Sequence, residues 1–216
     1  MESLRLYDYA ASANCLKARI LLAQLEREYE RVPIDIFDGD TLTDEYFAIN
    51  PARSTPVLQI GDSTYLPESN AILTYLAEGT RFLPEDRLAR AEIVRWLIVE
   101  QTHLMPPLGG LRFRLLTGRL KEDDRDAVRR RQLGEESLAM LDAQLAGRDF
   151  LVDGYSIADI AVYAYTHVAG EAGFRLADYP SVVRWIERVE AQPLFVNDLA
   201  PYPENARPGK GRSTYG

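Results

Sequence analysis

Cysteine and histidine are scarce in this sequence. Among its 216 residues there are one cysteine, Cys15, and two histidines, His103 and His167. A single cysteine excludes an intramolecular disulfide, and so few sulfur and imidazole ligands exclude a zinc cluster built from Cys and His. The sequence therefore predicts a protein that holds no metal.

A long uncharged apolar run and an excess of basic residues are also absent. No apolar stretch approaches the ~18 residues that span a bilayer, and no basic segment followed by a long apolar one opens the chain. The 33 acidic and 25 basic residues give a formal charge of −8, which disfavours binding to a nucleic-acid backbone. We therefore expect a cytoplasmic protein whose partners are small molecules or proteins, with neither membrane nor nucleic acid among them.

The composition is otherwise that of a folded protein. Hydrophobic residues make up 46% of the chain and charged residues 27%, close to the averages for globular domains. At ~100–200 residues per domain, this length predicts one large domain or two small ones. The change from mixed strand and helix signals to helix signals alone near residue 80 favours two domains.

The first third of the chain alternates strand-like and helix-like segments. A strand, a helix and a parallel strand are predicted at 4–7, 16–25 and 29–34. A short helix at 43–49, a hairpin of strands at 57–60 and 64–66, and a helix from Ser69 to Gly79 follow. The predicted order is βαβαββα.

Strand signals stop after Pro84, and the remaining segments have the helical period. Helices are predicted at 88–104, where Pro106-Pro107 ends or kinks the chain, and at 126–145, 160–168 and 181–191. Ser156 to Asp159 has the form of a capping box. The predicted class is α/β plus all-α, with an α/β domain at 1–79, a linker at 80–86, an all-helical domain at 87–200 and a flexible or loosely docked tail at 201–216.

Two helix starts are candidate binding sites. Ser12-Ala13-Asn14-Cys15 lies where the first strand turns into the first helix, and backbone N–H groups and the helix dipole stabilise an anion at such a place. Glu68-Ser69 precedes a second helix, where the serine can take a ligand carboxylate and the glutamate a ligand ammonium. Ordinary serine N-caps are the simpler interpretation of both segments.

Taken together, these segments resemble the cytosolic glutathione transferases. The stretch from Ser12 to Arg19 is similar to bacterial members that carry Ser-Gly-Asn-Cys followed by a basic residue. Other segments match the family in order and spacing: Asn50-Pro51, Thr55-Pro56-Val57-Leu58, Glu68-Ser69-Asn70-Ala71-Ile72-Leu73, Tyr75-Leu76-Ala77-Glu78, Trp96-Leu97, Glu100-Gln101, Pro106-Pro107 and Ser156-Ile157-Ala158-Asp159. The resemblance covers nearly all of the chain except the tail.

The resemblance implies a thioredoxin-like first domain, a helical second domain and glutathione as co-substrate. Redox relatives carry Cys-x-x-Cys or Cys-x-x-Ser, and counting back from Cys15 puts Ser12 at the place of their nucleophile. Ser12 and Asn14 are then the residues that hold the glutathione thiolate. The implied binding residues are Thr55 and a cis Pro56 for the cysteinyl part, Glu68 and Ser69 for the γ-glutamyl end, and Arg53 for the glycyl carboxylate.

The function implied is a homodimeric glutathione transferase of detoxification that attacks an electrophilic, apolar small molecule. Its substrate is expected in a cleft between the domains, against Tyr9, His103, Leu104 and Arg112. A glutathione-dependent disulfide reductase or peroxidase is the alternative enzyme. A non-catalytic partner-binding protein, like the family's stress-regulator and elongation-factor relatives, is the alternative of another class. Maleylacetoacetate isomerase activity ranks low, because the cysteine falls one place later than in those relatives.

Overall fold

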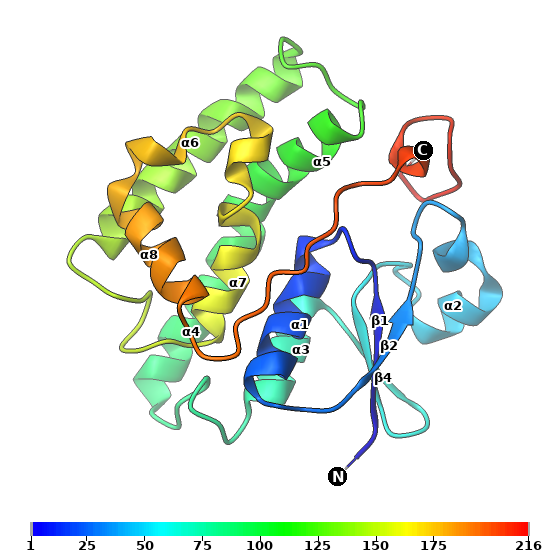
Figure 1. Cartoon of the computed structure of the whole chain (residues 1–216), viewed down its shortest axis with the longest axis horizontal. Coiled ribbons are helices and arrows are strands. Elements are labelled where there is room, and N and C mark those ends of the chain that lie inside the picture. The colour runs from blue at the N-terminus through cyan, green and yellow to red at the C-terminus, as the bar shows by residue number, and fades with distance from the viewer. Residues whose placement is uncertain (1, 216) are drawn as a thin grey trace. The chain divides into compact units, whose positions relative to one another are not determined.

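The computed structural model of the chain describes residues 2–215, and these residues form two compact units (Figure 1). The N-terminal unit consists of residues 2–76 together with residues 196–215, which we call the C-terminal strap. The helical unit is Ala77–Phe195. The predicted division of the chain at 79–87 lies close to the point where the first of these units gives way to the second.

A four-stranded mixed sheet forms the centre of the N-terminal unit. Its strands are β1 (Leu4–Asp8), β2 (Glu30–Pro33), β3 (Val57–Ile60) and β4 (Thr64–Pro67), in the spatial order β2-β1-β3-β4. β1 and β2 are parallel, whereas β3 is antiparallel to both β1 and β4. The thioredoxin-like arrangement predicted from the sequence, with its parallel crossover and its hairpin, is confirmed.

Helices cover both faces of this sheet. Figure 1 shows α1 (Ala13–Gln24) and α3 (Ser69–Ala77) on one face, and α2 (Asp44–Ile49), which follows the 3₁₀ turn η1 (Asp40–Leu42), on the other. Ten of the 12 residues of α1 are buried, and they include Lys17 and Arg19. Long charged side chains are rarely buried unless they are paired, so both of them need polar partners inside the unit.

The helical unit is built around one apolar helix. Its main helices are α4 (Arg87–Val99), α5 (Gly110–Leu116), α6 (Arg125–Leu145), α7 (Ile157–Thr166) and α8 (Pro180–Glu190), with short 3₁₀ turns η3 (Ala169–Ala172) and η4 (Leu176–Asp178). The predicted capping box begins α7: Ser156 accepts from the backbone of Ala158, and Asp159 accepts from the backbone of Ser156. Within the described residues, no helix is long and apolar enough to cross a membrane.

The helix does not end at Pro106-Pro107, which was one of the two predicted outcomes. A π-helical segment, η2 (Glu100–Gly109), continues α4 through both prolines into α5. Each proline lacks an N–H group and leaves a carbonyl of the preceding turn without its helical donor. Side chains of α6 hydrogen-bond two carbonyls of this segment. Ser137 Oγ donates to the His103 carbonyl, four residues before Pro107, at 2.7 Å, and Arg130 Nη1 donates to the Pro106 carbonyl at 3.2 Å.

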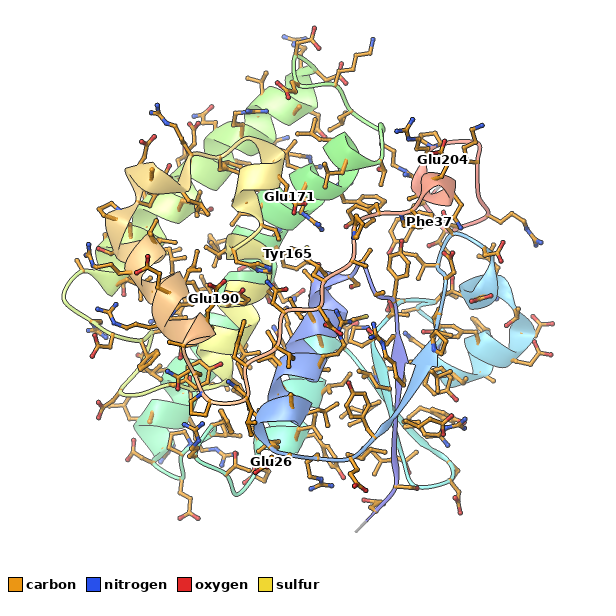
Figure 2. All side chains as sticks on the ribbon, in the orientation of Figure 1. Glu26, Phe37, Tyr165, Glu171, Glu190 and Glu204 are labelled. Carbon is orange, nitrogen blue, oxygen red and sulfur yellow. The ribbon has the colours of Figure 1, made fainter. Side chains whose placement is uncertain are left out.

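The C-terminal strap lies along the N-terminal unit. Phe37, in the loop after β2, and Glu204, in the strap's 3₁₀ turn η5 (Glu204–Ala206), mark the place where the two segments meet (Figure 2). The contacts that hold the strap are Arg19–Asp198 at 2.6 Å, Ala200 N to Ala10 O at 3.1 Å, Asn205 Nδ2 to Asp35 Oδ2 at 2.8 Å and Arg212 N to Phe37 O at 2.7 Å. Residues 201–216 were expected to be flexible or loosely docked, and these contacts fasten the described part of them to the sheet unit.

Candidate functional site

The candidate site lies at one edge of the sheet, where three chain segments converge. Tyr7 near the end of β1 pairs with Val57 at the start of β3, and Val57 pairs with Pro67 at the end of β4. The segments that continue from these three positions therefore start side by side. They are the loop to Ser12, the Thr55-Pro56 segment and the Glu68-Ser69 pair, so the strand register brings the predicted site residues to one place.

Ser12 and Cys15 differ in their access to solvent. Ser12 is the N-cap of α1: its hydroxyl oxygen accepts from the Cys15 N–H at 3.4 Å, and its side chain is partly exposed. The Cys15 side chain is completely buried, and its sulfur accepts from the Tyr9 N–H at 3.4 Å. Burial, together with the charge of Asp8, raises the pKa of Cys15 to about 12. At pH 7 the Cys15 side chain is therefore a neutral thiol.

Polar side chains link the starts of α1 and α3. Asn14 Oδ1 accepts from the Ser69 hydroxyl at 3.3 Å. Lys17 Nζ donates to Ser69 Oγ at 3.4 Å and to Asn70 Oδ1 at 3.3 Å. Sequence reasoning missed Lys17, because no local pattern shows that a lysine is buried. Its position three residues after Asn14, on the same face of a helix, was the only available signal.

Two of the predicted site residues adopt left-handed backbone conformations. The φ angle is +55° at Arg53 and +73° at Glu68. Such angles cost non-glycine residues free energy and concentrate at ligand sites. The exposed Glu68 carboxylate forms no hydrogen bond or ion pair with any residue from 2 to 215, so it is accessible to a cationic ligand group.

Arg53 supports the loop before α2. Its Nη1 atom donates to the carbonyls of Thr41 at 2.7 Å and Thr43 at 3.1 Å, and its guanidinium lies 4.9 Å from the centre of the Phe47 ring. A guanidinium has five N–H donors, so these contacts leave others for a ligand. Thr55 is half-buried, and the Thr55–Pro56 peptide bond is cis, as the resemblance implied.

The side chains expected to line a substrate cleft are differently placed. Leu104 is fully buried, and the buried Arg112 is paired with Glu171 at 2.7 Å, so neither presents a surface to a ligand. His103 is exposed, with Nδ1 at 2.7 Å from the Thr102 hydroxyl. Tyr9 lines an open pocket of about 630 Å³ in the N-terminal unit, and its buried hydroxyl has no hydrogen-bond partner among the described residues.

The acidic and sulfur side chains do not form a metal site within the described part of the chain. No group of three or more His, Cys, Asp or Glu side chains is arranged there to hold a metal ion. The polar groups that the three converging segments carry are hydroxyl, amide and carboxylate groups.

Family models for the two halves of glutathione transferases match this chain. The model of the glutathione S-transferase N-terminal domain matches residues 11–78, and that of the C-terminal domain matches residues 104–193. The sequence is 32% identical to glutathione S-transferase 3 of Zea mays, over 94% of this chain and 96% of that protein. It is 29% identical to the disulfide-bond oxidoreductase YfcG of Escherichia coli, over 86% of this chain and 89% of that protein.

Solved structures of glutathione transferases are also similar to this chain. A glutathione S-transferase from Pseudomonas fluorescens superposes with a TM-score of 0.88 at 40% identity, covering 91% of this chain and 99% of that one. A second family member from that organism, determined with two glutathione molecules bound, has a TM-score of 0.80 at 27% identity and covers 92% of both chains. The chain therefore belongs to the glutathione transferase family.

Proposed function

We propose that this protein is a glutathione transferase that holds the thiol of glutathione as a thiolate and delivers it to an electrophilic, apolar small molecule. The observation that carries the proposal is the contrast at the start of α1. Ser12 is partly exposed there, whereas Cys15 is fully buried. A hydroxyl at this place donates a hydrogen bond to a bound thiolate but forms no mixed disulfide.

The ionisation of glutathione needs only a modest stabilisation. A thiol with a pKa of ~8.5 is a few per cent ionised at neutral pH, and lowering that pKa by two units corresponds to ~2.7 kcal/mol. Hydrogen bonds to a charged acceptor and the dipole of a helix N-terminus supply free energies of this size. In the proposed mechanism, Ser12 and the Asn14 amide donate to the sulfur at the N-terminus of α1.

The remaining site residues bind the rest of the tripeptide. The Glu68 carboxylate takes the γ-glutamyl ammonium, and the backbone N–H of Ser69, at the N-terminus of α3, takes the α-carboxylate. Thr55, beside Pro56, offers its backbone to the cysteinyl part. Arg53 takes the glycyl carboxylate with the N–H groups that do not hold Thr41 and Thr43. The Glu68 carboxylate supports this arrangement, because it is exposed beside Ser69 and no cation from residues 2–215 is paired with it.

A glutathione-dependent disulfide reductase or peroxidase at the same site is the second candidate. The similarity to YfcG, a disulfide-bond oxidoreductase, favours it. In that case the bound glutathione thiolate attacks the substrate disulfide and releases one of its sulfurs as a thiol, and a second glutathione then resolves the mixed disulfide to give glutathione disulfide and the second thiol. Cys15 takes no part, because its side chain is fully buried.

The proposal includes a cytoplasmic, detoxifying homodimer. Exposed apolar side chains on the helical unit support self-association: Val94 and Ile98 lie one turn apart on α4 and are 47% and 57% exposed. Two-fold homodimers are also the commonest soluble oligomers.

Binding to immobilised glutathione and thermal stabilisation by millimolar glutathione test the proposal. A ligand at ~100 times its dissociation constant stabilises a protein by about 2.7 kcal/mol, so a clear rise in Tm is expected. Aryl halides, epoxides, hydroperoxides and mixed disulfides, assayed with glutathione, then separate transfer from reduction. Absence of both binding and stabilisation contradicts the proposal and favours the non-catalytic alternative.

A further inference from the structure

Lys17 has an unusual environment for a lysine. Its side chain is fully buried in α1, and its ammonium lies 3.4 Å from Ser69 Oγ and 3.3 Å from Asn70 Oδ1. Moving an ammonium group out of water is costly. A hydrophobic side chain of similar length packs between two helices without that cost, so the charge at this position points to a purpose other than packing.

We propose that Lys17 is a positioning residue that orients Asn14 as a hydrogen-bond donor to the glutathione sulfur. The inference rests on the function proposed above, and it connects the γ-glutamyl end of the ligand to the thiolate end. Lys17 does not touch the ligand in this account, since its side chain has no exposed surface. It acts through Ser69 and Asn14.

The direction of the hydrogen bonds carries the proposal. An ammonium group only donates, so Ser69 Oγ is the acceptor in its contact with Lys17. The Ser69 hydroxyl hydrogen is directed instead to Asn14 Oδ1, at 3.3 Å. The carbonyl oxygen of the Asn14 amide therefore points toward Ser69 and accepts its hydrogen bond. Its NH₂ group lies on the other side of the same planar amide and is left to donate elsewhere.

The helix geometry keeps these groups in register. Asn14 and Lys17 are three residues apart in α1 and share one face. Ser69 and Asn70 are the first two residues of α3. Asn14 is only partly buried, whereas Lys17 is inaccessible, so the chain of hydrogen bonds runs from the protein interior to the accessible start of α1.

Polarisation along the chain strengthens its last member. Hydrogen bonds in series reinforce one another, and an ammonium at the inner end increases the donor strength of each group that follows. With Lys17 in place, the Asn14 NH₂ group is fixed in orientation and is a stronger donor to an anion. Without the ammonium, Ser69 is free to donate elsewhere and the Asn14 amide is free to rotate.

The test measures the pKa of glutathione bound to the full chain, from the ultraviolet absorbance of the thiolate against pH. Lys17→Met keeps the length of the side chain and removes its charge and its donors. We expect the pKa of the bound thiol to rise by about one unit, which is a tenfold loss of thiolate well below that pKa. Lys17→Arg restores a buried cation with donors and should recover most of the shift.

A double-mutant cycle separates positioning from packing. If Lys17 acts through Asn14, Lys17→Met changes the pKa of the bound thiol in the parent protein but not in an Asn14→Ala background. Gln24→Met is the control, because it removes another buried polar side chain of α1, at the opposite end of the helix. It should change stability without changing the thiol pKa.

Two results overturn the proposal. One is an unchanged thiol pKa in Lys17→Met, and the other is an equal shift with and without Asn14. If Lys17→Met does not fold, Ser69→Ala breaks the same chain of hydrogen bonds. The pKa of the bound thiol is then compared for Ser69→Ala alone and for Ser69→Ala combined with Asn14→Ala, and an equal shift with and without Asn14 again overturns the proposal. Failure of the parent protein to bind glutathione or its S-methyl derivative contradicts the proposed function instead.

Discussion

Arg19 of α1 donates a hydrogen bond of 2.6 Å to Asp198 of the C-terminal strap, 179 residues later in the chain. The same guanidinium donates to the fully buried Asp8 at the end of β1, also at 2.6 Å. Asp8 in turn contacts Arg31 of β2. One side chain of α1 thus joins the central strand of the sheet to the strap, and the end of the chain is part of the folded unit that carries the site.

Substitution of Gly211 tests how firmly the C-terminal strap is docked on the rest of the N-terminal unit. A Cβ atom at this position would lie 2.4 Å from the carbonyl oxygens of both Asn205 and Phe37, and neither backbone group can move without disturbing the strap. We expect Gly211→Ala to lower the free energy of unfolding by roughly 1–3 kcal/mol and to expose the strap to proteases. Denaturant titration and limited proteolysis measure these effects.

Gly170 provides the matched control, because a Cβ atom there meets nothing within 4 Å. Gly170→Ala should change stability by less than ~0.5 kcal/mol. Equal stability and equal protease resistance of the two variants would mean that the strap contributes little to the folded N-terminal unit.

Asp159 predicts a pH dependence of folding stability. Burial raises the pKa of this carboxyl to about 6, despite hydrogen bonds from Trp185, Leu151 and Ser156. The ordinary Asp pKa of ~3.9 applies to the unfolded chain, so between pH ~4 and ~6 the folded state binds more protons. The contribution of Asp159 to stability is therefore full below pH ~4 and is lost as the pH rises through about 6, with a change of roughly 2 kcal/mol between pH 4 and pH 6.

Asp159→Asn isolates this contribution, since its side chain does not titrate. The free energy of unfolding of the parent minus that of the variant, measured by denaturant titration at pH 4, 5 and 6, should decrease as the pH rises. A difference that is constant or that grows over this range contradicts the raised pKa.

The proposed role of Glu68 predicts that its substitution weakens the binding of glutathione. If its carboxylate holds the γ-glutamyl ammonium, Glu68→Ala should weaken glutathione binding by about 10- to 100-fold, the usual range for a hydrogen bond to a charged group. A glutathione analogue that lacks the amino group should bind parent and variant equally in calorimetry. An equal loss of affinity for both ligands would assign Glu68 a purely structural role.

The proposed homodimer has a mass in solution that light scattering can measure. Light scattering at micromolar concentration should return twice the chain mass of 24.4 kDa. Val94→Glu combined with Ile98→Glu places charges on the exposed apolar turn of α4 and should shift the protein toward the single-chain mass. A parent protein that already scatters as one chain contradicts the dimer.

Much of the fold follows from local sequence patterns. The strand Val57–Ile60 has the predicted bounds, and Ser156 and Asp159 form the capping box that their spacing indicates. Both depend on residues that are near one another in the chain. The predicted crossover accounts for the pairing of β1 with β2, and the predicted hairpin for that of β3 with β4. The convergence of the segments that carry Ser12, Thr55 and Glu68 also needs the antiparallel pairing of β1 with β3, which neither local pattern predicts.

The features that the sequence did not predict depend on distant partners. The helical segment continues past Pro106-Pro107, where Arg130 donates to a carbonyl 24 residues away and Ser137 donates to one 34 residues away. The strap docks through backbone groups such as the Phe37 carbonyl, which leave no mark on residue type. Lys17 resembles a surface lysine in sequence, and only the packing of α1 against α3 shows that it is buried.

The account depends most directly on Ser12 rather than Cys15 acting on the sulfur. The decisive measurement is turnover with glutathione, together with the pKa of bound glutathione, in Ser12→Ala and Cys15→Ala. Loss of an oxyanion-type donor slows reactions by roughly ten- to a thousandfold, so Ser12→Ala should raise the thiol pKa and reduce turnover by that factor, while Cys15→Ala should mainly lower stability. Full activity in Ser12→Ala with loss of activity in Cys15→Ala would contradict the account and make the protein a thiol–disulfide enzyme.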